Sequence, residues 1–396
     1  MGNSQVETTD NRYKVFRSHN VYILGAGFSA DAGLPLIYNF LDRMREGIDW
    51  ISENCTTGEQ EAVNEVFKFR HWAAGAAHRV QIDLDNIEEL FSLASASEGD
   101  AGNDYVPRAI AATLRYAASR QEHHTFRVSV DKRNFKPPAR WRSEAANASV
   151  EDPQAYRLSV YDLYAGLLSG ALCNEVPGMR HTVISFNYDT LLEDALKNLK
   201  IPFSYELPLN GADYHPSAKE IGAALMDQSA LRVLKLHGSV NWAINRVSQT
   251  TNTLTVYSQY EDLIADGKHP YLLPPTWRKV FAGALGPVWT HAVDAIAEAS
   301  RIIVIGSSLP KTDLYFKYLL AGGLRDNISL RDIIFVTLGD YSALAENVAQ
   351  LFQPSLANRI HWETQGIQQA VANGVFRQRI DRSLLSAFGN MIDPFH

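Results

Sequence analysis

Five short apolar runs recur along the chain, and none of them alternates regularly between apolar and polar positions. They are Val21–Leu24, Thr182–Phe186, Arg232–Leu236, Arg301–Ile305 and Asp332–Thr337, each rich in Val, Ile and Leu. Strands buried on both faces of a parallel sheet have this pattern, because helices cover both faces. A buried helix would be longer, and each run ends at glycine or polar residues. We therefore expect five parallel strands.

Stretches with helical periodicity separate or follow these runs, at Thr190–Leu199, Val288–Ala299, Asp313–Leu320, Ser342–Leu351 and Thr364–Phe388. Strands that alternate with helices predict an α/β fold, a Rossmann-like doubly wound parallel sheet. One segment departs from this pattern, because Asn241–Asp266 contains an alternating stretch that predicts a small hairpin.

The region between the first and second runs is helical in pattern throughout. It contains DLDNIEELFSLASAS, YVPRAIAATLRYAASR and AYRLSVYDLYAGLLSGAL, with no buried strand. We predict an inserted helical subdomain at residues 51–174, with residues 1–50 and 175–396 forming the Rossmann-like domain. Within the insertion, Gln121–Asp152 is polar and basic and contains two adjacent prolines, which predicts a long loop.

Composition places the chain among ordinary globular proteins. Of 396 residues, 46% are apolar and 20% are charged, and the formal net charge is -7. That charge argues against coating nucleic acid by bulk electrostatics. The basic stretch Arg127–Arg142, with Phe135 and Trp141 between its charges, has two interpretations, a solvated loop and a local nucleic-acid contact.

Cysteine usage and the N-terminus indicate a compartment. Cys55 and Cys173 are the two cysteines, too few for a disulfide framework or a four-cysteine zinc site. The first dozen residues lack the apolar core of a signal peptide, and no apolar run approaches the ~20 residues that cross a bilayer. We expect a cytoplasmic protein with no metal and no membrane partner.

Polar and glycine residues follow four of the apolar runs. The first run is followed by GAGFS, the second by NYD, the third by HGS and the fourth by GSS. In an open parallel sheet, ligands bind at the carboxyl ends of the strands. These segments are therefore expected to converge on one site.

The GAG segment is a candidate phosphate-binding loop. Gly25 and Gly27 permit a tight turn and a close approach of the backbone to a pyrophosphate, and a following helix N-terminus attracts anions. With Ala30, they match the looser GxGxxG/A fingerprint. A hydride-transfer enzyme would next present a strand ending in an acid, whereas Asp42 and Asp49 lie in a helical pattern. Ordinary dehydrogenase chemistry is therefore disfavoured.

The other strand ends carry candidate catalytic groups, each with a structural alternative. Asn187 and Asp189 lie at the mouth of the second strand, where they could instead cap the following helix. His237, beside a glycine, is a candidate base. Gly306–Ser308 could supply donors to phosphate or ribose, or form a tight turn. The sequence has no HExxH, Walker A or GxSxG motif.

The ordered set GAGFSADAGLP, FNYD, LHGS and VIGSSL resembles the sirtuin family of NAD-dependent enzymes. Three departures argue against protein deacylation. Both cysteines precede His237, so the zinc ribbon that deacylases carry after this histidine is missing. Leu36, Ile37 and Tyr38 stand where deacylases have Asp-Phe-Arg, and the insertion before Asn187 is much larger. What remains resembles the sirtuin-like NAD-consuming effectors of bacterial anti-phage defence.

This resemblance implies cleavage of NAD+ to nicotinamide and ADP-ribose, or a cyclic form, and assigns roles to residues. Asn187 would bind the ribose region and the attacking water, Asp189 the carboxamide or ribose hydroxyls, and His237 would act as the base. The cofactor-binding residues would be Gly25, Ala26, Gly27 and Ser29 at the pyrophosphate, Phe28 over the nicotinamide, and Gly306, Ser307 and Ser308 on the adenosine side.

The resemblance also implies a homo-oligomer, triggered by a separate partner such as a HerA-type ATPase or a phage-derived activator. A hypothesis from a different class remains open. In that alternative, the chain is a sensor or scaffold subunit that binds NAD or ADP-ribose without turnover, or gains nuclease activity in a complex. Retention of both Asn187 and His237 favours the enzyme, because a pure binder needs the glycines but not both polar groups.

Overall fold

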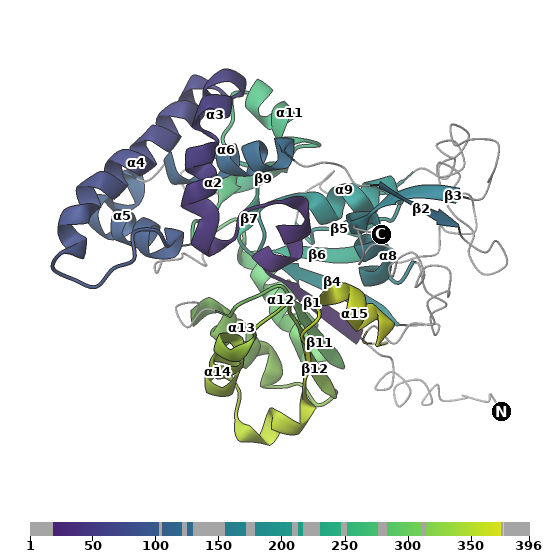
Figure 1. Ribbon diagram of the computed structural model, residues 1–396. Coiled ribbons are helices and arrows are strands. Elements are labelled where there is room, and N and C mark those ends of the chain that lie inside the picture. Colours follow the sequence, from purple (N-terminus) through teal and green to yellow (C-terminus); the bar gives the residue numbers. More distant parts are fainter. Residues whose placement is uncertain are drawn as a thin grey trace, which may run out of the picture.

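The computed structural model describes residues 19–102, 105–120, 125–129, 155–171, 179–207, 213–216, 230–246, 252–275, 283–309, 314–373 and 375. A seven-stranded sheet in the order β13-β12-β11-β1-β4-β6-β5 lies at its centre (Figure 1). Every strand pair in this sheet is parallel. The strands are β1 (His19–Leu24), β4 (Arg180–Ser185), β5 (Phe203–Ser204), β6 (Leu231–Lys235), β11 (Arg301–Ile305), β12 (Asp332–Val336) and β13 (Ile360–Glu363).

The five predicted strands are confirmed, and two edge strands were missed. All six residues of β1 and all five of β11 are buried, as unalternating runs require. The edge strands give a weaker signal for a physical reason. β5 has only two residues, and β13 has no residue in the buried class, so neither produces a continuous apolar run.

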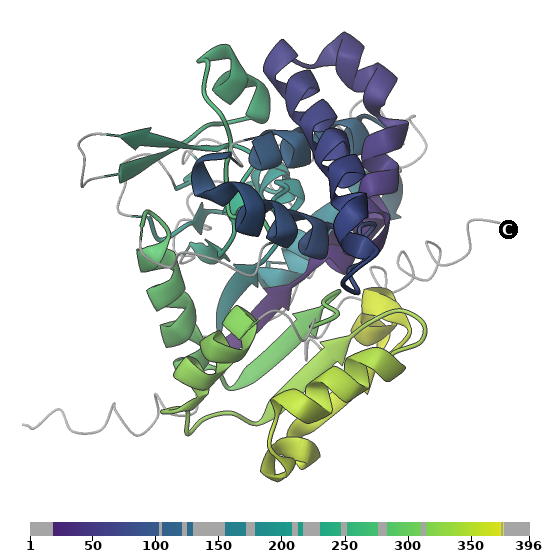
Figure 2. The same cartoon turned by 90° about the vertical axis from the view of Figure 1, so that its left-hand side faces the viewer.

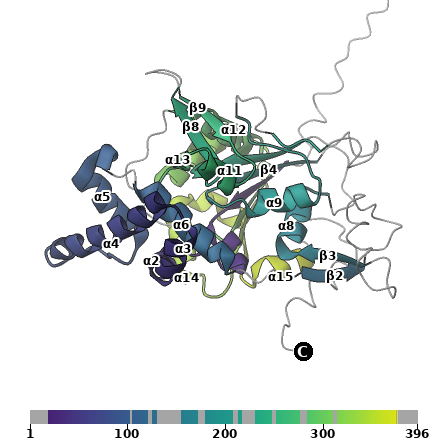
Figure 3. The same ribbon diagram turned by 90° about the horizontal axis from the view of Figure 1, so that it is seen from above.

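Helices follow the strands at the predicted positions. They are α9 (Leu191–Asn198), α12 (Gly286–Glu298), α13 (Leu314–Leu324), α14 (Ser342–Leu351) and α15 (Gly366–Ala372). α12 packs on β1 and β6 and lies on the opposite side of the sheet from α8 (Val160–Leu168) in Figure 3. Most of the predicted closing segment beyond α15 lies outside the described residues. The α/β fold with a doubly wound parallel sheet is therefore the observed architecture.

A second group of helices stands beyond one end of the sheet. It comprises α2 (Phe40–Glu46), α3 (Ile48–Asn54), α4 (Thr57–Ala77), α5 (Ile87–Gly102) and α6 (Tyr105–Ser119), the purple and blue ribbons of Figures 1 and 2. Their apolar faces form a buried cluster separate from the one around the sheet. Thr56 caps α4 through a reciprocal pair with Glu59, which fixes where this long helix begins.

The predicted insertion contains strands that the sequence did not indicate. β2 (Thr125–Ser129) and β3 (Ala155–Ser159) pair antiparallel. The loop prediction for Gln121–Asp152 is thus wrong at Thr125–Ser129, and AYRLS is a strand rather than a helix. β2 alternates apolar and polar residues over five positions and β3 over only its last four, too few to stand out beside the helical stretches. The rest of the predicted loop, including most of the basic stretch Arg127–Arg142, lies outside the described residues.

The predicted hairpin within Asn241–Asp266 is confirmed. β8 (Trp242–Arg246) pairs antiparallel with β9 (Asn252–Val256), and α11 (Tyr260–Ala265) follows. α11 lies beside the helical group in Figure 1, where Tyr260 donates to the buried Glu59 carboxylate at 2.7 Å. This contact joins the excursion to α4.

Candidate functional site

A cavity of about 740 Å³ opens at the carboxyl ends of the strands. Its walls include the loops that follow β1, β4, β6, β11 and β12, together with residues of the helical group. β1 lies between β11 and β4, so the strand order reverses direction here. This is the switch point at which open α/β sheets bind ligands. Ten of the eleven predicted site residues line the cavity: Gly25, Ala26, Gly27, Phe28, Asn187, Asp189, His237, Gly306, Ser307 and Ser308.

The glycine loop after β1 is held against the loop after β11. The Gly25 N–H donates to the Ile305 carbonyl at 3.0 Å, and the Gly27 N–H donates to the Gly306 carbonyl at 2.8 Å. A Cβ on Gly25 would lie 2.7 Å from the Gly306 oxygen, and one on Gly27 would lie 2.8 Å from the Gly306 Cα. Both positions therefore require glycine because the two loops contact each other, which the sequence did not suggest.

Gly306 is the most constrained of the three glycines. Its φ is +65°, and a Cβ would come within 2.2 Å of the Phe28 nitrogen. Both the backbone conformation and the space demand glycine here. The GSS segment is thus a tight turn, as its structural alternative proposed, and it lines the cavity as well.

The segment after the glycines is a 3-10 helix, η1 (Ala26–Ala32), rather than an α-helix. Phe28 is buried against Tyr161 and Tyr164 of α8, with ring centroids 5.6 Å away in each case. The Tyr161 hydroxyl donates to the Phe28 carbonyl at 3.0 Å and accepts from the Ala32 N–H at the same distance. α8 therefore holds η1 in place, and the Phe28 ring is part of the core as well as of the wall.

Ser29 does not line the cavity, contrary to the role predicted for it at the pyrophosphate. Its side chain is buried behind the wall. There, its hydroxyl donates to Asp189 Oδ2 at 2.7 Å and accepts from Asn187 Nδ2 at 3.0 Å. Ser29 therefore connects the two polar residues that follow β4.

Asn187 is oriented by the loop after β1. Its Nδ2 donates to the Gly25 carbonyl and to Ser29 Oγ, both at 3.0 Å. In the opposite amide orientation, Asn187 Oδ1 would face the Gly25 carbonyl oxygen, and neither atom could donate. The Gly25 carbonyl therefore identifies the Asn187 atom beside it as Nδ2. Both amide hydrogens are thus used within the protein, and Oδ1 is the end of the amide left for a ligand. Asn187 does not cap α9.

Asp189 contacts the start of α9 and also lines the cavity. Its Oδ1 accepts from the Leu191 N–H at 3.1 Å, at the first turn of α9, while Oδ2 accepts from Ser29. Desolvation raises the pKa of the Asp189 carboxyl above its usual range, and the nearby Lys235 ammonium and the Ser29 hydroxyl oppose that rise. Asp189 is therefore a carboxyl in the cavity wall whose pKa is raised.

His237 lies two residues after the end of β6 and is 7% exposed. Its ring lies against Phe186, with centroids 5.1 Å apart, and against Tyr188, with centroids 6.0 Å apart. Its carbonyl accepts from the Leu273 N–H at 2.9 Å, where β7 (Gly238–Ser239) pairs with β10 (Tyr271–Leu272). Two aromatic rings and this short sheet orient the imidazole toward the cavity that it lines.

The remaining predicted residues, Ser307 and Ser308, are less buried. Ser307 Oγ accepts from the Leu309 N–H at 3.3 Å, and the Ser308 carbonyl accepts from Asn347 at 3.1 Å. The first bond is internal to the turn after β11, and the second holds this turn against α14. Ser308 is exposed and lines the cavity.

Several wall residues were not predicted. The loop after β12 contributes Thr337, Leu338 and Asp340. The same strand-end argument that selected the other loops would have found them. Tyr38, which is 73% exposed, lines the cavity beside Leu36 and Ile37. Glu88 of α5 enters from the helical side, and no local signal in the sequence indicates this.

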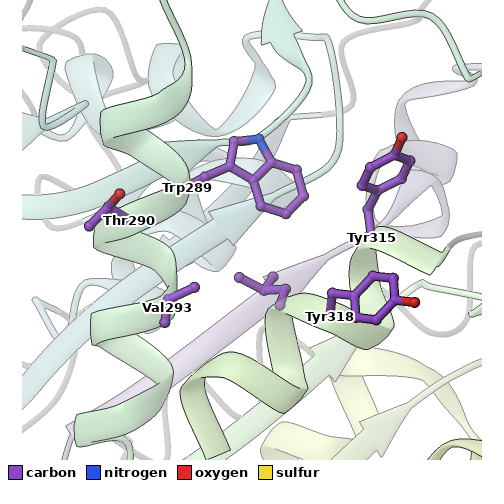
Figure 4. A pocket seen from close by; sticks show the side chains of 6 residues that line it. Trp289, Thr290, Val293, Tyr315 and Tyr318 are labelled. Carbon is purple, nitrogen blue, oxygen red and sulfur yellow. The ribbon is translucent and has the colours of Figure 1, made fainter. Parts of the chain in front are cut away.

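A second, smaller pocket of about 240 Å³ lies between α12 and α13 (Figure 4). Its lining is aromatic and aliphatic with one threonine, and it contains none of the predicted residues. The Trp289 indole in its wall donates to the Leu236 carbonyl at 3.2 Å, so this residue supports the strand end from behind. Convergent polar groups make the larger cavity the candidate functional site.

Two further observations concern only the part of the chain that the structure describes. No group of three or more His, Cys, Asp or Glu side chains is arranged to hold a metal ion there. No helix in those ranges is long and apolar enough to span a bilayer.

Part of the chain matches one known protein family. Residues 181–353 match the SIR2-like domain family. A comparison with curated proteins finds no match. Sir2Tm bound to a propionylated peptide is 13% identical, with a TM-score of 0.36 over 94% of this chain and 100% of that chain. A structure of a Sir2 enzyme, solved to explain mechanism and regulation, is 12% identical, with a TM-score of 0.36 over 96% of each chain.

Proposed function

We propose that this protein is an NAD+ glycohydrolase that cleaves NAD+ to nicotinamide and ADP-ribose, or to a cyclic form. The observation that carries the proposal is the convergence of Asn187, Asp189 and His237 with the two glycine loops on one cavity at the switch point. The SIR2-like match over residues 181–353 includes all three polar residues and supports it.

The chemistry requires little acid catalysis. Breaking the bond between ribose and nicotinamide generates an oxocarbenium-like sugar, as in glycoside hydrolysis. The nicotinamide nitrogen is already cationic in NAD+, so the leaving group needs no proton. The site has to bind the ribose, desolvate the leaving group and position a water.

The residues present fit these tasks. Asn187 Oδ1, the free end of an amide that the Gly25 carbonyl orients, accepts a hydrogen bond from the attacking water or a ribose hydroxyl. His237 takes the proton from that water or hydroxyl, and Asp189 holds the carboxamide or ribose hydroxyls. Without an acyl-lysine to intercept the sugar cation, water is the default acceptor and gives ADP-ribose, whereas a cyclic form requires the adenine ring of the same molecule to attack in place of water.

The test is to follow NAD+ and its products by chromatography with wild type, His237→Ala and Asn187→Ala. Each protein is assayed alone and together with the protein encoded beside it. We expect nicotinamide and ADP-ribose from wild type and a loss of product with either variant. Wild type that produces nothing in any assembly state, or variants that retain full activity, would refute the glycohydrolase.

One observation favours the alternative of a sensor that binds NAD or ADP-ribose without turnover. Both amide hydrogens of Asn187 are used to hold the protein together, so this residue has a structural task independent of chemistry. Calorimetry separates the two functions, because a sensor binds NAD+ tightly without producing nicotinamide.

The motif resemblance extends the proposal to a biological setting. We infer that the enzyme acts in the cytoplasm as a homo-oligomer that depletes NAD+ in anti-phage defence, with a HerA-type ATPase or a phage-derived activator as its trigger. Light scattering of the purified chain, alone and with the candidate partner, measures the assembly state. A monomer whose turnover no partner changes would contradict this extension.

A further inference from the structure

A buried ion pair lies directly behind the wall of the cavity. Lys235 is the last residue of β6, and its side chain is 1% exposed. Its Nζ lies 2.8 Å from Glu193 Oε1 of α9, whose side chain is 3% exposed. The Tyr205 hydroxyl also donates to Glu193 Oε1, at 3.4 Å. None of these three residues lines the cavity.

The ammonium of this pair reaches the loop that carries Asn187 and Asp189. Lys235 Nζ donates to the backbone carbonyl of Asp189. Asp189 is thus fixed at three atoms, because its Oδ1 accepts from Leu191 and its Oδ2 accepts from Ser29. Lys235 also lies two residues before His237 in the same segment, so one segment supports two of the three candidate catalytic groups.

We propose that Lys235, paired with Glu193, is a positioning residue that fixes the Asp189 carbonyl and so the direction of the carboxyl in the cavity wall. This inference rests on the proposed function for its catalytic consequence. Its structural consequence, a rigid loop between β4 and α9, is independent of NAD+.

Energetics argue against a merely stabilising role. Burying two charges carries a desolvation penalty for each ion, and a pair of well-packed apolar residues of similar volume often gives a protein of equal or greater stability. Unlike an apolar side chain, the Lys235 ammonium donates a hydrogen bond to the Asp189 carbonyl and places a positive charge near the Asp189 carboxyl. The titratable groups facing Asp189 are Lys235, Glu193 and Tyr161. Of the two ions in the pair, Lys235 has the larger effect on Asp189 and favours its ionised form.

The experiment replaces both ions at once, as Lys235→Met with Glu193→Leu, because removing only one would leave a buried charge without a partner. The matched control is Arg301→Met with Asp332→Leu. This pair is 3.4 Å apart, largely buried, and lies at the opposite ends of the strands. The measurements are thermal unfolding, kcat and KM for NAD+ as a function of pH, and hydrogen exchange of residues 187–191.

We expect the Lys235/Glu193 double variant to fold and to lose roughly tenfold to a hundredfold in kcat, as displaced catalytic groups do. The acid limb of its pH profile should move to higher pH, because loss of the ammonium makes Asp189 harder to ionise. Amides of residues 187–191 should exchange faster, while those of β1 stay protected. The control double variant should keep the wild-type kcat and pH profile.

A folded double variant with wild-type kcat, pH profile and exchange would overturn the proposal. If wild type itself produces no nicotinamide, the glycohydrolase fails, and the exchange of residues 187–191 in the double variant still decides the positioning role. If the double variant does not fold, exchange in wild type decides instead. Amides of residues 188–191 should then be as protected as those of β4, and exchange as fast as in the exposed 339–342 segment would contradict the proposal.

Discussion

A buried histidine lies at the amino ends of the parallel strands and another at their carboxyl ends, but the surroundings of the two differ. At the amino ends, His19 is 2% exposed, and its Nε2 lies 2.9 Å from Thr182 Oγ1. The Ser300 hydroxyl accepts from the His19 N–H at 2.9 Å. At the carboxyl ends, His237 is 7% exposed, packs against two aromatic rings and lines a cavity.

This difference shows that burial of a polar side chain does not by itself identify a site. What separates the two histidines is the space beside them. Loops that diverge at the switch point leave a cavity beside His237, whereas His19 is hydrogen-bonded to Thr182 and Ser300. Four predictions test this comparison, from the largest expected effect to the smallest.

Replacement of each histidine by glutamine tests the comparison directly. His237→Gln should reduce kcat for NAD+ cleavage by roughly 10²- to 10⁴-fold, the contribution typical of a general base, with little change in unfolding free energy. His19→Gln should leave kcat within about twofold. Steady-state kinetics and urea unfolding of both variants measure this. Equal losses of kcat in the two variants would remove the distinction between the two ends.

The glycine contact at the switch point is tested by Gly306→Ala, with Gly33→Ala as a matched control. Both residues have positive φ, +65° and +70°, but a Cβ at Gly33 would have nothing within 4 Å. Gly33→Ala should therefore cost about 1 kcal/mol of unfolding free energy from backbone strain. Gly306→Ala should cost about 2 to 4 kcal/mol and weaken NAD+ binding, because the β1 loop must move. Similar effects of both variants in urea unfolding would contradict the loop contact.

The amino end makes a prediction about stability and pH. Burial lowers the pKa of His19 from 6.5 to about 3. At a pH between these two values, this histidine is protonated in the unfolded chain and neutral in the folded chain. Stability is therefore lost as the pH falls from 6.5 toward 3. This histidine should contribute a loss of about 2 kcal/mol between about pH 6.5 and pH 5. Urea unfolding of wild type and His19→Gln over this range measures the difference. An identical pH dependence in the variant would refute the assignment.

The smallest effect is expected from the residue behind the cavity wall. Ser29→Ala removes the 2.7 Å hydrogen bond that helps to ionise Asp189, so the pKa of this carboxyl should rise further. The acid limb of kcat should then move to higher pH, with a loss of about tenfold or less at neutral pH. The control is Ser52→Ala, whose hydroxyl bonds only within an exposed helix. An acid limb that stays in place would show that Ser29 does not influence Asp189.

Most of the sheet could be predicted from the sequence. A fully buried parallel strand must be apolar at nearly every position, so β1, β4, β6, β11 and β12 are visible as unbroken runs. β5 and β13 could not be predicted in this way, because an edge strand is short or partly exposed. The pairing of β2 with β3 was also missed, because it depends on residues far apart in the chain.

The site was predictable to the same extent and for the same reason. The carboxyl ends of parallel strands meet at one edge, so the residues that follow the runs already indicate where Asn187, Asp189 and His237 converge. The sequence alone therefore determined the fold class, the edge of the sheet that carries the candidate site and the strand-end loops that form part of the cavity wall. Only the tertiary structure decided that Gly25 and Gly27 contact Gly306, that Ser29 lies behind the wall, and that Lys235 and Glu193 support Asp189. Those outcomes depend on distances between segments far apart in the chain or on which way a side chain points, and no local pattern of residues encodes either.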